Sequence, residues 1–210
     1  MFSIPNQDAE HLDILLVMEI TPGALDGILT ALGEQLGAQG APQEIVVIGG
    51  SALLALGLVH RATRDVDVLA IAADGQIRGA DPLPEPLREA RDRVARDFGL
   101  PGDWLNPGPT ELLRWGLPKD FWSRTVTRHY GNALTVHFAG RFDQIHFKLY
   151  ATVDQGGGRH EADLRALAPT RDELAAAARW SMTQDPSPGY RMVLVDALRH
   201  LGAGNVDLAT

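Results

Sequence analysis

The segment "IGGSALLALGLVHRATRDVDVLA", residues 48–70, decides the fold. It begins with the end of an apolar strand and continues through two glycines and a serine into a short helix over residues 51–58. A second apolar strand follows, and it carries Asp65 and Asp67. A strand, a glycine turn, a helix and a second strand predict an α/β unit. Unpaired buried carboxylates are costly, so the two aspartates need a function or a partner.

The spacing of the two aspartates predicts a metal site. In a β-strand, residues i and i+2 point to the same face, about 6.6 Å apart along the chain. Asp65 and Asp67 are therefore predicted to share one face, while Val66 and Val68 point into the core. Hard oxygen ligands suit Mg²⁺, which binds one or two carboxylates together with substrate phosphates. Metal ions bridged by such carboxylates can promote an in-line phosphoryl displacement. We expect Mg²⁺ here, with Mn²⁺ as the alternative.

Gly49, Gly50 and Ser51 predict a phosphate-binding turn beside these carboxylates. Glycines at a strand-to-helix turn let backbone N–H groups approach a ligand closely, and a helix N-terminus favours anions. Ser51 is expected to cap the helix or to donate its hydroxyl to a phosphate. The chain contains no Walker A motif, no dinucleotide-binding G-x-G-x-x-G after a strand, no H-E-x-x-H and no G-x-S-x-G. A phosphate turn and a carboxylate pair on adjacent strands predict a nucleoside triphosphate site.

Length and composition limit the classes of protein. The chain has 210 residues, of which 45% are hydrophobic and 22% are charged, as in an ordinary globular protein. No cysteine occurs, which excludes disulfides and thiolate metal sites. Residues 1–13 lack the basic and apolar regions of a signal peptide, and the apolar run Ile45–Val59 is too short to span a membrane. We therefore expect a cytoplasmic protein that does not bind membranes.

The pattern of the whole chain predicts the α/β (α+β) class, with a small mixed β-sheet core, its helices, and a helical C-terminal lobe. Residues 1–140 are expected to form the core and residues 141–210 the lobe. A hairpin is predicted around Gly131-Asn132, and Thr170 with Glu173 predicts a capping box. The predicted helices, besides the short one described above, cover residues 21–40, 85–99, 141–155, 171–185 and 189–202.

Two signatures in the chain resemble those of known nucleotidyltransferases. Gly49-Gly50-Ser51, a gap of 13 residues and Asp65-Val66-Asp67 resemble the signature of the polymerase-beta-type nucleotidyltransferase superfamily. The pattern Arg61-x-Thr63-x-Asp65-x-Asp67 resembles more narrowly the AbiEii-type nucleotidyltransferases, the toxin halves of abortive-infection and toxin–antitoxin pairs. The stretch "HFKLYATVDQGGGRHEADLRALAPT", residues 146–170, resembles the second signature of that group, with Lys148 and Asp163 in its lysine and aspartate places. The resemblance covers about residues 43–180.

This resemblance implies a fold, an activity and a set of site residues. The fold is a small mixed sheet with helices, followed by a helical lobe that closes over the nucleotide. The activity is the Mg²⁺-dependent transfer of a nucleotide from a nucleoside triphosphate to an acceptor, with pyrophosphate leaving. The implied catalytic residues are Asp65, Asp67, Lys148 and Asp163. The implied nucleotide-binding residues are Gly49, Gly50, Ser51, Arg61, Thr63 and Lys148, the lysine acting as a point charge on the triphosphate.

The chain departs from the superfamily at the third carboxylate, which active members often carry on a later strand. The predicted strand "NALTVHFAG", residues 132–140, offers His137 and no acid. Asp143 follows only at the start of the next helix, where we expect it to be the N-cap. Either Asp163 supplies the missing acid, or the site works with two carboxylates, or catalysis is lost.

The acceptor is expected to be RNA, most specifically a tRNA 3′ end, and a cognate antitoxin protein is the expected partner. The net charge of −8 opposes general nucleic-acid binding but not a local basic groove. The alternatives are a small-molecule transferase of the antibiotic-modifying kind and a non-catalytic nucleotide-binding or interaction module. Candidate phosphate-binding arginines, which would otherwise be dispersed solubilising charge, are Arg124, Arg128, Arg141, Arg159, Arg165, Arg171 and Arg179, and candidate base-stacking residues are Trp104, Trp122 and Tyr130.

Overall fold

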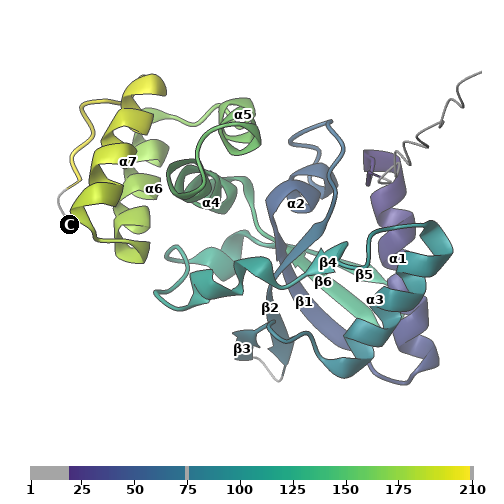
Figure 1. Ribbon diagram of the computed structural model, residues 1–210. Coiled ribbons are helices and arrows are strands. Elements are labelled where there is room, and N and C mark those ends of the chain that lie inside the picture. Colours follow the sequence, from purple (N-terminus) through teal and green to yellow (C-terminus); the bar gives the residue numbers. More distant parts are fainter. Residues whose placement is uncertain (1–18, 74–75, 209–210) are drawn as a thin grey trace, which may run out of the picture.

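The computed structural model describes residues 19–73 and 76–208 (Figure 1). Its α-helices, 3₁₀ helices (η) and strands are α1 (Pro22–Ala38), β1 (Gln43–Ile48), α2 (Gly49–Ala55), β2 (Val66–Ala73), β3 (Gln76–Gly79), α3 (Glu85–Phe98), β4 (Leu105–Asn106), η1 (Gly108–Leu113), η2 (Phe121–Arg124), β5 (Val126–Tyr130), β6 (Leu134–Phe138), α4 (Arg141–Asp154), α5 (Arg159–Ala166), α6 (Arg171–Gln184) and α7 (Pro188–His200). Within the described residues, no helix is long and apolar enough to cross a membrane.

One mixed sheet forms the centre of the molecule. Its strands lie in the order β3-β2-β1-β6-β5, and the two-residue strand β4 pairs with β2. β1 runs antiparallel to β2 and parallel to β6, while β5 and β6 form an antiparallel hairpin. The predicted α/β class, the mixed sheet and the hairpin around Gly131-Asn132 are confirmed.

Both faces of β1 are covered, which explains its uninterrupted apolar sequence. Ile45 and Val47 belong to the larger core cluster, which includes Leu29 of α1 and Leu87 of α3. Val46 and Ile48 alternate with them and belong to a second cluster that includes Phe147 of α4. Figure 1 shows α1 and α3 at one end of the molecule and α4, α5, α6 and α7 gathered at the other.

The register between β1 and β2 places Asp67 at the glycine turn. Ile48, the last residue of β1, pairs with Asp67, and the pairing skips one residue of β2 at Leu69. Such a bulge leaves a backbone group without its ladder partner. Here the Thr110 hydroxyl donates to the Leu69 carbonyl at 2.8 Å. The bulge therefore sets which residue of β2 lies beside the start of α2.

The C-terminal helices follow the sequence prediction closely. The predicted helix over residues 141–155 is α4, and the capping box of Thr170 and Glu173 at the start of α6 is confirmed. The expectation that Asp143 caps its helix was wrong, because Gly140 is the N-cap. Asp143 lies in the first turn of α4, fully buried, and accepts hydrogen bonds from Arg124 Nε and Nη2 at 2.9 and 2.6 Å. It is a structural ion-pair partner.

Candidate active site

Asp67 is a carboxylate held in an unfavourable environment. It is the second residue of β2, and Asp65 directly precedes the strand. The Asn106 side chain donates to Asp67 Oδ1 at 3.4 Å from the neighbouring strand β4. Burial, and after it the charge of Asp65, raises the pKa of Asp67 to about 6. A bound cation would lower the pKa of Asp67 again, because it favours the ionised carboxylate.

The two glycines make room for side chains. Gly49 has a left-handed backbone, with φ of +74°, and a Cβ atom there would collide with Asp67 Oδ2. A Cβ atom on Gly50 would lie 2.7 Å from the hydroxyl oxygen of Thr63. The buried Thr63 hydroxyl in turn donates to Asp65 Oδ1 at 3.4 Å. The turn is therefore shaped around Asp67 and Thr63, a role that the sequence pattern did not reveal.

The polar groups of this turn are partly committed within the protein. The Gly49 N–H donates to Gln144 Oε1, which reaches over from α4, at 3.2 Å. Ser51 is fully buried, and its hydroxyl donates to the carbonyl oxygen of Ile48 at 3.5 Å. Only Gly49 of the three turn residues lines the cleft described below.

Arg61, Lys148 and Asp163 form a charge cluster that joins the segment before β2 to α4 and α5, with Lys148 and Asp163 buried and Arg61 partly exposed. Arg61 donates through Nε and Nη2 to the two oxygens of Asp163 at 2.7 and 2.5 Å. Lys148 Nζ lies 2.8 Å from Asp163 Oδ2. Burial acts to raise the pKa of Asp163, but the hydrogen bonds from Arg61 and Lys148 outweigh it and hold that pKa below its ordinary value. The structure thus brings together Arg61 of the first signature and Lys148 and Asp163 of the second.

This cluster bears on the missing third carboxylate. Both oxygens of Asp163 have cationic partners, which is the arrangement of a positioning carboxylate rather than of a metal ligand. Val47 pairs with Phe138, so Ala139 follows beside Ile48, on the far side from Asp67. The residue that follows β6 on this side of Ile48 is therefore an alanine and not an acid. Within residues 19–73 and 76–208, no three Asp, Glu, His or Cys side chains gather as a metal site would require.

His137 does not take the place of the third acid. Its Nε2 contacts Glu44 Oε1 at 2.5 Å, and its Nδ1 contacts the Thr127 hydroxyl at 2.8 Å. Both partners belong to the strands on either side of β6. The candidate metal ligands are therefore Asp65 and Asp67, and two carboxylates fit Mg²⁺ only when other ligands, such as substrate phosphates and waters, complete the coordination.

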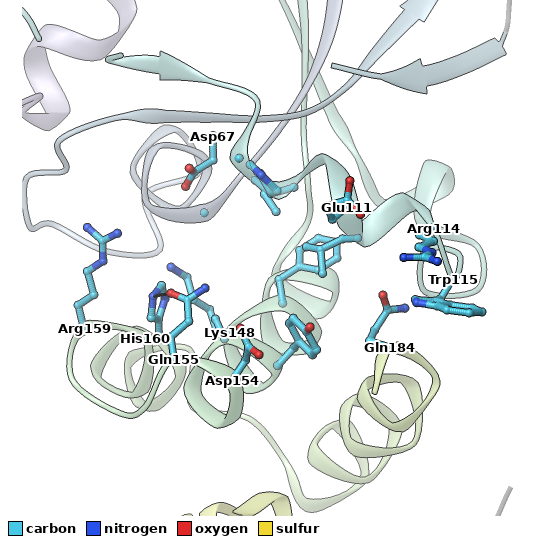
Figure 2. A pocket seen from close by; sticks show the side chains of 18 residues that line it. Asp67, Glu111, Arg114, Trp115, Lys148, Asp154, Gln155, Arg159, His160 and Gln184 are labelled. Atoms are coloured by element: carbon cyan, nitrogen blue, oxygen red, sulfur yellow. Dashed lines mark hydrogen bonds between the residues drawn. The ribbon is translucent and has the colours of Figure 1, made fainter. Parts of the chain in front are cut away.

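A cleft of about 530 Å³ opens in front of Asp67. Figure 2 shows Lys148, Arg159 and His160 on one side of it, and Asp67 lies toward the same side. The opposite side carries Glu111, Arg114, Trp115 and Gln184. The apolar part of the lining includes Ile48, Leu112, Phe147, Tyr150 and Ala151. The cleft is thus charged at one end and aromatic at the other.

Arg159 and His160 are site residues that the sequence analysis did not assign to the nucleotide. Arg159 begins α5 and lines both this cleft and an adjoining hollow that Arg61 and Thr63 share. Within the described part of the chain, Arg159 makes no hydrogen bond or ion pair. Burial, followed by the charges of Lys148 and Arg159, lowers the pKa of His160. The available signal was their position directly after the glycine run, in the second signature.

The other RNA-binding candidates do not converge on this cleft. Of the seven arginines only Arg159 lines it. Trp104 and Tyr130 are buried, so the expectation that they could stack on a base was wrong, whereas Trp122 is 43% exposed. The remaining arginines bond elsewhere, namely Arg124 with Asp143, Arg128 with Asp26, Arg141 with Glu173, Arg165 with Glu161, Arg171 with the Asn205 carbonyl and Arg179 with the Asp207 carbonyl.

Comparison with known proteins identifies a family for most of this region. The family model described as "nucleotidyltransferase of unknown function (DUF6036)" matches residues 25–155, more than half of the chain. The matched segment contains the glycine turn, Asp65, Asp67 and Lys148, and it ends before Asp163. It supports the nucleotidyltransferase superfamily without supporting the narrower AbiEii-like group. Neither the comparison with curated proteins nor the comparison with solved structures gave a match.

Proposed function

Since the chain belongs to this family of nucleotidyltransferases of unknown function, we propose that it transfers a nucleotide from a nucleoside triphosphate to an acceptor. The observation that carries the proposal is that Asp67, whose pKa is raised by burial and by the neighbouring Asp65, lines the same cleft as Lys148 and Arg159. In the reaction the oxygen of an acceptor hydroxyl attacks the α-phosphorus and its proton is released to solvent, the bond from the α-phosphorus to the α–β bridging oxygen breaks, and pyrophosphate leaves. Cations placed along a polyphosphate stabilise the charge that develops on the leaving group.

Each site residue then has a role that its contacts support. Asp65 and Asp67 would hold Mg²⁺, or Mn²⁺ as the alternative, and the bound ion would neutralise phosphate charge. Lys148 and Arg159 bind triphosphate oxygens from the C-terminal lobe. Asp163 is fixed by Arg61 and holds Lys148 in position.

Three smaller parts of the proposal concern the residues around the metal ligands. Thr63 orients Asp65 through its hydroxyl. The turn of Gly49, Gly50 and Ser51 approaches the triphosphate, and the position of Gly49 on the cleft supports this contact. The His160 ring, which is neutral at pH 7 because its pKa is lowered, can donate or accept a hydrogen bond at the phosphate end.

We further propose an AbiEii-like, toxin-type enzyme that modifies RNA at a tRNA 3′ end and has a cognate antitoxin protein. Its support is the pattern Arg61-x-Thr63-x-Asp65-x-Asp67 together with the contact of Arg61 and Lys148 with Asp163. The arginine positions give this acceptor no further support. The alternatives are a small-molecule acceptor, as in antibiotic-modifying enzymes, and a nucleotide-binding module without catalysis.

The test is to incubate the protein with ATP, CTP, GTP or UTP, each labelled at the α-phosphate, with Mg²⁺ or Mn²⁺ and total tRNA. We expect label on tRNA with the wild type and none with Asp67→Asn, while Asp103→Asn, on an exposed loop, behaves as the wild type. Label on a small alcohol or a protein instead would overturn the RNA acceptor but not the transferase. Nucleotide binding without transfer to any acceptor would favour the non-catalytic module.

A further inference from the structure

Trp115 stands out among the tryptophans as the most exposed, and it lies at the cleft. It lies between η1 and η2 with 59% of its surface exposed, whereas Trp104 is fully buried. Figure 2 places it at the end of the cleft opposite Arg159. The Arg114 guanidinium lies over its ring, 5.2 Å from the ring centroid. An aromatic side chain offered to solvent at the edge of a cleft can stack on a flat ligand.

The segment that carries Trp115 is fixed in place. Gly116 follows it with a left-handed backbone, φ +91°. The Gly116 carbonyl accepts two hydrogen bonds from α6, one from Trp180 Nε1 at 3.1 Å and one from Gln184 Nε2 at 3.2 Å. Because these bonds tie the segment to the C-terminal lobe, the ring is presented with less conformational freedom to lose on binding.

The two ends of the cleft match the two ends of one kind of molecule. Lys148 and Arg159 supply positive charge at one end, Trp115 lies at the other, and the apolar side chains of Leu112 and Phe147 line the same cleft. A polyanion joined to an aromatic ring fits this order. We infer that the Trp115 end of the cleft binds the nucleobase of the donor nucleoside triphosphate, with the base stacked on Trp115. This inference rests on the proposed function and adds the residue that holds the base.

The test separates the base from the triphosphate. Affinities for ATP, CTP, GTP, UTP and inorganic tripolyphosphate are measured by calorimetry with Mg²⁺ on the full chain. We expect Trp115→Ala to weaken binding of the preferred nucleotide about tenfold, the scale of losing one base–aromatic stack. Binding of tripolyphosphate should not change, and Trp115→Phe should restore most of the loss. Trp122→Ala is the matched control, because Trp122 is also exposed but lines a different hollow.

Each other outcome contradicts the inference in a distinct way. If Trp115→Ala weakens nucleotide and tripolyphosphate equally, the residue supports the cleft and not the base. If it leaves nucleotide binding unchanged but weakens binding of a short RNA with an unpaired 3′ end, the ring serves the acceptor, and the assignment to the donor base is wrong. If the wild type binds tripolyphosphate and nucleotide equally well, no base subsite exists although the phosphate site stands. If it binds neither, the proposed function fails together with this inference.

Discussion

The raised pKa of Asp67 makes a quantitative prediction about stability. The pKa is about 6 in the folded protein against an ordinary value of 3.8. A group with a raised folded-state pKa costs nothing below its unfolded pKa, and its cost grows until the pH passes the folded pKa. The difference of about 2 pH units corresponds to about 3 kcal/mol, since one unit is worth about 1.4 kcal/mol. Above pH 6 the metal-free protein therefore carries a destabilising carboxylate.

Asp67→Asn removes this charge at nearly constant shape and keeps an oxygen that Asn106 can donate to. At pH 8 we expect the variant without metal to be more stable than the wild type by up to about 3 kcal/mol. For a chain of this size that gain raises Tm by about 6–12 °C. At pH 3.5 the gain should shrink to a few tenths of a kcal/mol, because Asp67 is then protonated in the folded state and mostly protonated in the unfolded state. Mg²⁺ should raise the Tm of the wild type at pH 8 but not that of the variant.

The measurement is thermal unfolding by circular dichroism at the two pH values, with and without Mg²⁺. Asp103→Asn serves as the control, because Asp103 is exposed and its replacement should change Tm little at either pH. The reasoning is refuted if Asp67→Asn has the Tm of the wild type at pH 8, or if it gains the same amount at pH 3.5. It is also refuted if Mg²⁺ stabilises the variant as much as the wild type.

Three further predictions follow from the same site. Lys148→Ala should weaken binding of a nucleoside triphosphate more than of the monophosphate, and equal losses in calorimetry would remove the lysine from the triphosphate site. Gly57→Ala, at φ +66° with open space around it, should lower the free energy of unfolding in urea by about 1 kcal/mol. Gly49→Ala should lower it further and abolish Mg²⁺ binding, because its Cβ atom would meet Asp67. Equal urea midpoints for the two variants would contradict the close approach of Asp67. Asp163→Asn should cost about 3 kcal/mol at pH 7, as for a broken buried ion pair. Because the pKa of Asp163 is lowered in the folded protein, the stabilisation by its ion pairs is present above pH 3.8 and is lost as the pH falls through the folded-state pKa. A stability difference between Asp163→Asn and the wild type that does not change with pH would refute this prediction.

Local patterns were sufficient to predict most of the fold. The run of apolar residues before Gly49, the spacing to Asp65 and Asp67 and the turn at Gly131-Asn132 each determine structure within a few residues. The capping box of Thr170 and Glu173 is equally local, since each side chain binds the backbone of the other. Patterns of this kind depend on the backbone period and on turn chemistry, both of which can be read directly from sequence.

Contacts between distant segments could not be predicted in the same way. Arg61 and Asp163 are 102 residues apart, and the signatures named both without showing that they bind each other. The predicted N-cap role of Asp143 failed for the same reason. Its actual partner, Arg124, lies on η2, and the local helix pattern does not include that contact. The bulge at Leu69 is stabilised by Thr110, again from a distant loop. Each of these features depends on tertiary packing that no local period records.

The charges around the cleft explain why a cation–triphosphate complex suits it better than either component alone. Arg61 and Lys148 both contact Asp163, and the charge of Lys148, although it lowers the pKa of Asp67, does not offset burial and the charge of Asp65. Burial, and after it the charge of Asp65, therefore raises the pKa of Asp67 to about 6. A divalent cation would supply the missing positive charge, but with two carboxylates it needs further oxygen ligands, which triphosphate oxygens provide. Triphosphate oxygens alone would meet the two aspartates as like charges, so binding of the nucleotide and of the cation should each depend on the other.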